Sequence, residues 1–143
     1  MTQNLVFIDS RVADYQSLIT SLSADSEWVL IDDSQDGVLQ IQSALTDYSN
    51  LDSIQIISHG SAGTLYLGST VLNSNNLLSY QSQLQSIGQA LSETGDILLY
   101  GCNVAQGQSG QIFASTLAHL TNADIAASTN LTGGVTQGGD WLL

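Results

Sequence analysis

The chain has 143 residues, of which 43% are hydrophobic, so it is long enough for one domain with a buried core. Its 13 acidic residues face a single Lys or Arg, and the net charge of −12 excludes binding to nucleic-acid phosphates and disfavours attraction to an anionic membrane. The lone cysteine, Cys102, excludes an internal disulfide and a zinc site built from cysteines.

The chain begins with a predicted strand, helix and second strand. Residues 5–8 are a continuous apolar run, which predicts a buried strand, and residues 12–22 follow with apolar side chains at helical spacing. Residues 28–31 are a second apolar run and predict a second strand. Asp33 or Ser34 is expected to cap the next helix. The inward face of that helix is expected to carry Val38, Ile41, Leu45 and Tyr48.

The middle of the chain carries a predicted third strand and a surface hairpin. Residues 54–57 predict a buried strand that runs directly into His59. Residues 64–72 alternate in polarity and contain a Gly-Ser turn signal, which predicts a small hairpin. Asn75 or Asn76 is expected to cap a long helix that runs to about Ser92, before a break at 94–96.

The last part of the chain adds a fourth strand, a helix and two short strands. Residues 97–100 predict a strand that ends at Gly101 and Cys102, and residues 109–120 predict a helix. The inward face of this helix is expected to carry Ile112, Phe113, Thr116, Leu117 and Leu120. Residues 123–127 predict a fifth strand, and Asp140-Trp141-Leu142 predicts a final short one.

The alternation of strands and helices predicts an α/β fold. Apolar runs without polar alternation are typical of parallel strands buried on both faces, so helices are expected on both sides of one sheet. Ligands in such sheets bind beyond the carboxyl ends of the strands. His59 and Cys102 both follow strand ends, and we expect them to be neighbours at this edge.

A thiol and an imidazole at adjacent strand ends are the two side chains that a cysteine hydrolase requires as nucleophile and base. Neighbouring strands lie about 4.8 Å apart, so His59 could accept the proton of Cys102, whose thiolate is the nucleophile. The N–H groups of Gly60 and Cys102 could form an oxyanion hole, because Gly60 has no Cβ to keep a substrate carbonyl away. The competing interpretation is a buried cysteine that packs as a small apolar side chain, beside a structural histidine.

The strand that ends in His59-Gly60 and the strand that ends in Gly101-Cys102 resemble those of the caspase-like clan of cysteine peptidases. The resemblance implies a three-layer α/β/α sandwich with a mostly parallel six-stranded sheet in the order 2-1-3-4-5-6, whose last strand is antiparallel and contains Trp141. It also implies that Cys102 is the nucleophile and His59 the catalytic histidine. Residues 1–143 would form one such domain, and no metal or organic cofactor is expected.

Nearly the whole chain is also similar to an uncharacterised bacterial domain found near the N-termini of very large secreted repeat proteins and adhesins. The matching stretches are Val6-Phe7-Ile8-Asp9-Ser10, Ser58-His59-Gly60-Ser61-Ala62-Gly63, Leu98-Leu99-Tyr100-Gly101-Cys102-Asn103-Val104-Ala105, Ala126-Ala127-Ser128-Thr129 and Gly138-Gly139-Asp140-Trp141. We expect a segment of a longer chain, secreted or at the cell surface, monomeric and not inserted in a membrane. Residues 1–4 carry no basic region of a classical signal peptide.

Two functional hypotheses follow. The first is a caspase-like endopeptidase whose substrate is a peptide or protein, either its own parent chain or a surface partner. The second is a catalytically inactive binding or structural module at the N-terminus of a large adhesin. The acidic composition opposes a thiolate and favours the second hypothesis.

Four further residues are candidates for substrate contacts near the same edge: Asp9, Arg11, Ser128 and Asp140. In caspases, arginines hold a substrate aspartate, and Arg11 is the one Lys or Arg in this chain. An acidic rim instead favours a basic or neutral residue before the scissile bond.

Overall fold

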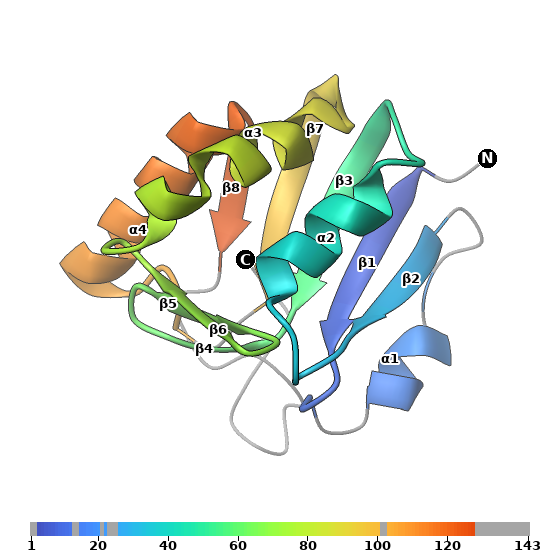
Figure 1. Ribbon diagram of the computed structural model, residues 1–143, viewed down its shortest axis with the longest axis horizontal. Coiled ribbons are helices and arrows are strands. Elements are labelled where there is room, and N and C mark those ends of the chain that lie inside the picture. The colour runs from blue at the N-terminus through green and yellow to red at the C-terminus, as the bar shows by residue number, and fades with distance from the viewer. Residues whose placement is uncertain (1–2, 13–14, 21, 23–25, 101–102, 128–143) are drawn as a thin grey trace.

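The structure is a computed structural model, and it describes residues 3–12, 15–20, 22, 26–100 and 103–127. Its centre is a parallel sheet in the order β2-β1-β3-β7-β8 (Figure 1). The strands are β1 (Asn4–Asp9), β2 (Ser26–Ile31), β3 (Leu51–Ile57), β7 (Leu91–Tyr100) and β8 (Asp124–Ala127). The predicted α/β class and parallel sheet are confirmed. The predicted last strand around Trp141 lies outside the described residues.

Helices cover both faces of the sheet. One face carries the larger hydrophobic core and packs against α2 (Gly37–Leu45), α3 (Gln81–Gln89) and α4 (Gly107–Thr121). The short 3-10 helix η1 (Leu77–Tyr80) leads into α3. The helix α1 (Tyr15–Thr20) packs on the opposite face. No helix in the described ranges is long and apolar enough to cross a membrane.

Alternate residues of β1 supply the two cores. Leu5 and Phe7 point into the larger core, while Val6 and Ile8 point toward α1, and all four side chains are fully buried. This burial on both faces explains why the strand is a continuous apolar run without polar alternation.

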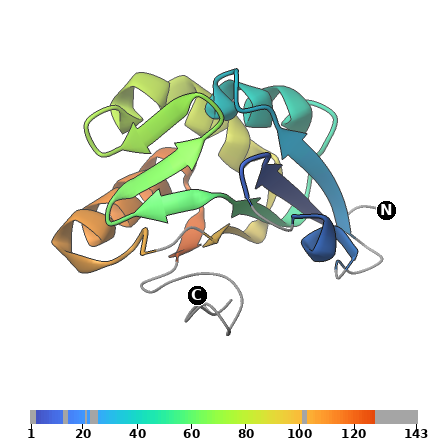
Figure 2. The same ribbon diagram turned by 90° about the horizontal axis from the view of Figure 1, so that it is seen from below.

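A second, antiparallel sheet lies at the carboxyl end of the parallel strands. It consists of β4 (His59–Ser61), β5 (Thr64–Leu67) and β6 (Thr70–Asn73), in that order. Figure 2, which shows the molecule from below Figure 1, presents this small sheet toward the viewer. The predicted hairpin over 64–72 is therefore present, with a third strand that begins at His59.

Two predicted helix boundaries are wrong. The cap of α2 is Asp36 rather than Asp33 or Ser34, because its carboxylate accepts hydrogen bonds from the N–H groups of Val38 and Leu39. The helix expected to continue to about residue 92 ends at Gln89, and the chain then starts β7.

The predicted break at 94–96 falls inside β7. A Cβ at Gly95 would lie 2.7 Å from the carbonyl oxygen of Leu51, so glycine lets the two strands approach closely at an irregularity in their register. Glycine here allows two strands to approach each other, whereas the sequence alone predicted that residues 94–96 break the preceding helix.

Of the five residues predicted on the inward face of α4, three are buried, Thr116 is partly buried and one is exposed. Phe113, Leu117 and Leu120 are buried, as expected, but Ile112 is 48% exposed. Residue 112 is rotated by about 100° from residue 113 around the helix axis, and in α4 this rotation turns Ile112 toward solvent.

These two neighbours provide a matched test of the core. Phe113→Ala should lower the free energy of unfolding by about 3–5 kcal/mol, because it leaves a cavity beneath α4. Ile112→Ala should change it by less than about 1 kcal/mol, because the side chain is half exposed and alanine favours helix. Urea unfolding followed by circular dichroism measures both values, and equal losses would contradict this packing of α4.

Candidate functional site

The site is built on the carboxyl ends of two adjacent parallel strands. In the register of β3 and β7, Ile57 is paired with Tyr100, and the N–H of Ser58 donates to the carbonyl of Tyr100 at 3.5 Å. His59 follows Ile57 by two residues. Cys102 follows Tyr100 by the same number in the sequence and lies outside the described residues.

The imidazole of His59 is exposed but held at one nitrogen. Its Nε2 lies 3.0 Å from the backbone carbonyl oxygen of Arg11, in the loop after β1. Since a carbonyl oxygen only accepts hydrogen bonds, Nε2 must carry the proton in this contact. In the neutral ring, Nδ1 is then the nitrogen with a free lone pair, which is the state that a general base requires.

Gly60 lies in β4, at the edge of the small sheet that pairs with no other described strand. β4 is an edge strand of that sheet in the described residues, and Ser61 pairs with Thr64 across a two-residue turn. The pair that flanks such a turn exchanges hydrogen bonds, so the next pair, Gly60 with Leu65, does not. The N–H of Gly60 therefore points away from β5, where an oxyanion could accept its hydrogen bond.

The β4–β5 turn is tied to the chain segment that comes after Cys102 in the sequence. The N–H of Gly63 donates to the carbonyl of Val104 at 2.9 Å, and Val104 is fully buried. This contact joins the strand that carries His59 and Gly60 to the segment that leads into α4.

Asp9 and Arg11 form an ion pair at the end of β1. The Asp9 side chain is 0% exposed, whereas that of Arg11 is 41% exposed. Arg11 donates from Nε to Oδ1 at 3.0 Å and from a terminal nitrogen to Oδ2 at 3.1 Å, and its backbone N–H donates to Oδ1 at 2.9 Å. The N–H of Gly68, in the β5–β6 turn, donates to Oδ2 at 2.8 Å. Each carboxylate oxygen thus receives two donors.

These donors set the charge state of Asp9. Burial alone would raise the pKa of the carboxyl, but the hydrogen bonds from Arg11 and Gly68 outweigh burial and lower the pKa below its usual value of 3.8. The same pairing raises the pKa of Arg11. Both groups are therefore charged at neutral pH.

The predicted site residues divide into three groups. His59 and Arg11 are in contact, through the imidazole and a backbone carbonyl. Asp9 lies nearby, but its carboxylate is occupied by Arg11 and Gly68, and its predicted contact with substrate stays a prediction. Cys102, Ser128 and Asp140 lie outside the described residues.

Two contributions to this site were not anticipated from sequence. The contact of the Arg11 carbonyl with His59 could not be predicted from sequence, because every residue has a backbone carbonyl. Gly68 was recognised as part of a turn, but its contact with Asp9 joins positions 59 residues apart.

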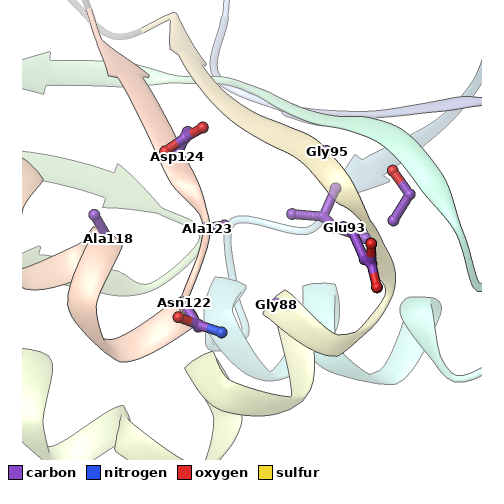
Figure 3. Close-up of a pocket in the computed structure, with 9 residues that line it drawn as sticks. Gly88, Glu93, Gly95, Ala118, Asn122, Ala123 and Asp124 are labelled. Atoms are coloured by element: carbon purple, nitrogen blue, oxygen red, sulfur yellow. The ribbon is translucent and has the colours of Figure 1, made fainter.

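A cavity of about 210 Å³ opens at the opposite end of the parallel sheet (Figure 3). Its walls come from the ends of α3 and α4 and the beginnings of β7 and β8, and include Glu93, Asn122 and Asp124. The lining residues that the structure describes include neither cysteine nor histidine. Within the described part of the chain, no three His, Cys, Asp or Glu side chains group as metal ligands.

The chain matches a family model described as "Domain of unknown function (DUF4347)" over residues 5–143. No curated protein matches it. Among solved structures, the crystal structure of caspase-1 from Spodoptera frugiperda is similar over 75% of this chain, with 15% sequence identity and a TM-score of 0.42. The match covers 50% of that caspase, so the chain spans about half its length, and a likeness of this degree assigns no activity.

The lowered pKa of Asp9 predicts how stability depends on pH. The carboxylate stabilises the folded state above the usual pKa of 3.8, and this contribution is lost as the pH falls through the lower folded value. Asp9→Asn should therefore lower the free energy of unfolding by about 1–3 kcal/mol near neutral pH, and by progressively less below about pH 4.

Urea unfolding at a series of pH values measures this difference. Asp47→Asn, which changes an exposed carboxylate, is the control and should cost less than about 0.5 kcal/mol. A loss for Asp9→Asn that stays constant down to pH 2 would show that the charge of Asp9 contributes nothing.

Proposed function

This chain belongs to the family described as a domain of unknown function, DUF4347, and we propose that it is a caspase-like cysteine endopeptidase domain. In this proposal Cys102 is the nucleophile and His59 the general base. The observation that carries it is the pairing of Ile57 with Tyr100, because each residue lies two positions before one member of the Cys-His pair.

The two residues that follow each strand end are long enough to bring the thiol of Cys102 and the imidazole of His59 together. Adjacent strands lie about 4.8 Å apart, and two residues span at most about 7 Å. From Tyr100, the chain is long enough to bring the thiol of Cys102 to Nδ1 of His59. The hydrogen bond from Nε2 to the Arg11 carbonyl leaves that nitrogen as the proton acceptor.

The proposed reaction is an acyl transfer in two halves. Nδ1 of His59 takes the thiol proton, and the sulfur of Cys102 attacks the substrate carbonyl carbon. The N–H groups of Gly60 and Cys102 bind the oxyanion that forms. When the peptide C–N bond breaks, the imidazolium returns the proton to the leaving amine, and water then hydrolyses the thioester.

The charge distribution favours a neutral or basic substrate residue before the scissile bond. Arg11 is the one Lys or Arg in the chain, and its guanidinium is paired with Asp9. A substrate aspartate would have to displace that ion pair. We further propose that the substrate is a segment of the parent chain or of a protein at the cell surface. Ser128 and Asp140 would lie beside it, while the side chains of Asp9 and Arg11 stay paired with each other.

The second candidate function is an inactive caspase-like module that binds a partner or supports a large adhesin. The net charge of −12 favours it, because an acidic field disfavours the thiolate of Cys102.

Labelling of Cys102 separates the two functions. With a peptide-like thiol-reactive probe, we expect His59→Ala to slow labelling by about 100-fold or more, because it removes the general base. His119→Ala is the matched control, since His119 is the other histidine and lies exposed in the last turn of α4. Labelling that is no faster than that of a free thiol, and insensitive to His59, would favour the inactive module.

A peptide series tests the specificity. Among peptides with Arg, Leu, Asn or Asp before the scissile bond, the Asp peptide should be cleaved most slowly. The one Arg or Lys of the chain, Arg11, is already paired with Asp9 and does not bind the substrate carboxylate. Cleavage is measured by release of a fluorescent amine, with Cys102→Ala as the blank. A clear preference for Asp would contradict the assigned role of Arg11.

A further inference from the structure

Arg11 makes two kinds of contact at once. Its side chain and its own N–H close on Asp9, two residues earlier, while its carbonyl oxygen binds Nε2 of His59 at 3.0 Å. The residue that neutralises the buried carboxylate is thus the residue whose backbone orients the imidazole.

The segment from Asp9 to Val12 is fixed by further hydrogen bonds. The N–H of Ser10 donates to the carbonyl of Ile31, at the end of β2, at 3.1 Å. The N–H of Val12 donates to the carbonyl of Asp9 at 3.0 Å and closes a turn around Arg11. The direction of the Arg11 carbonyl follows from this turn together with the Asp9–Arg11 pair.

The same ion pair reaches the sheet that carries His59. Arg11 donates from a terminal nitrogen to the carbonyl of Gly68 at 2.7 Å, and the N–H of Gly68 donates to Asp9. Gly68 has a φ of +59°, and a Cβ there would lie 2.2 Å from the carbonyl oxygen of Gln35, so this backbone position requires glycine.

The contacts form a closed ring. From Asp9 the ring passes through Gly68 into β5, whose Tyr66 pairs with His59 in β4, and returns through the imidazole and the Arg11 carbonyl. His59 is therefore held by its backbone through β5 and by its side chain through Arg11, and Asp9 contacts both neighbours, through Gly68 and through Arg11.

We propose that the Asp9–Arg11 ion pair is a positioning device that holds the imidazole of His59 in the Nε2–H tautomer, with Nδ1 available as a base. The link to catalysis rests on the proposed function. The effect of the ion pair on the tautomer of His59 is independent of the proposed function. Asp9 and Arg11 act through His59 and are positioning residues.

The guanidinium is chemically suited to this task. Its planar fork reaches both carboxylate oxygens of Asp9 and the Gly68 carbonyl together, whereas a lysine ammonium is a point charge that cannot keep this geometry. Arg11→Lys should therefore keep the charge pair and the fold, yet loosen the direction of the carbonyl.

The test uses the tautomer of His59, read from its ring nitrogen chemical shifts at a pH where the ring is neutral. Wild type should hold the Nε2–H form, and Arg11→Ala and Arg11→Lys should give a mixture of the two tautomers. The rate of Cys102 labelling should fall up to about 100-fold in Arg11→Ala, and by less in Arg11→Lys. If Arg11→Ala does not fold, Arg11→Lys decides alone.

Ile87→Val is the stability control, because it removes one methyl group from a core site in α3 and should leave both readouts unchanged. A wild-type tautomer in the Arg11 variants would overturn the proposal, as would equal losses of labelling in Ile87→Val. A tautomer shift together with labelling that ignores His59→Ala would support the positioning device and refute the peptidase.

Discussion

A carboxylate buried completely at the end of β1 constrains the whole carboxyl edge of this molecule. An ionised side chain without water requires donors on both oxygens, and Asp9 receives them from Arg11 and Gly68. These donors belong to the loop after β1 and to the β5–β6 turn. Separating the antiparallel sheet from the parallel sheet would therefore remove the Gly68 donor from Asp9 and the Gly68 carbonyl that accepts from Arg11. β4 of that sheet begins at His59, whose imidazole contacts the Arg11 carbonyl, so the ion pair and the imidazole belong to one network of contacts.

The parallel sheet was predictable, because its strands are buried on both faces and their sequences show this directly. Val6 and Ile8 face α1 while Leu5 and Phe7 face the larger core, so no polar residue interrupts the run. The boundaries were less predictable, because Gly95 and Asp36 take roles that depend on distant partners. Gly95 accommodates the Leu51 carbonyl, and Asp36 both caps α2 and accepts a hydrogen bond from Tyr80.

In the site, too, features set by local sequence were predictable, and features set by distant partners were not. The place of His59 follows from a strand that ends just before it, which is a local property of the sequence. The role of Asp9 did not follow, since an acidic residue at a sheet edge can face either substrate or a partner such as Arg11. In a chain with one Lys or Arg, that cation pairs with the one buried carboxylate found in the described core. The acidic surroundings then remain uncompensated elsewhere, and they shape both the proposed substrate preference and the competing, inactive alternative.

A crystal structure of the protein after reaction with a peptidyl thiol-reactive inhibitor tests the central claim most directly. We expect a covalent bond from the sulfur of Cys102, with Nδ1 of His59 within about 4 Å of that sulfur and the inhibitor oxygen facing the N–H of Gly60. We also expect that Nε2 still binds the Arg11 carbonyl. A sulfur that lies more than about 7 Å from the imidazole, with the inhibitor pointing away from Gly60, would contradict that claim.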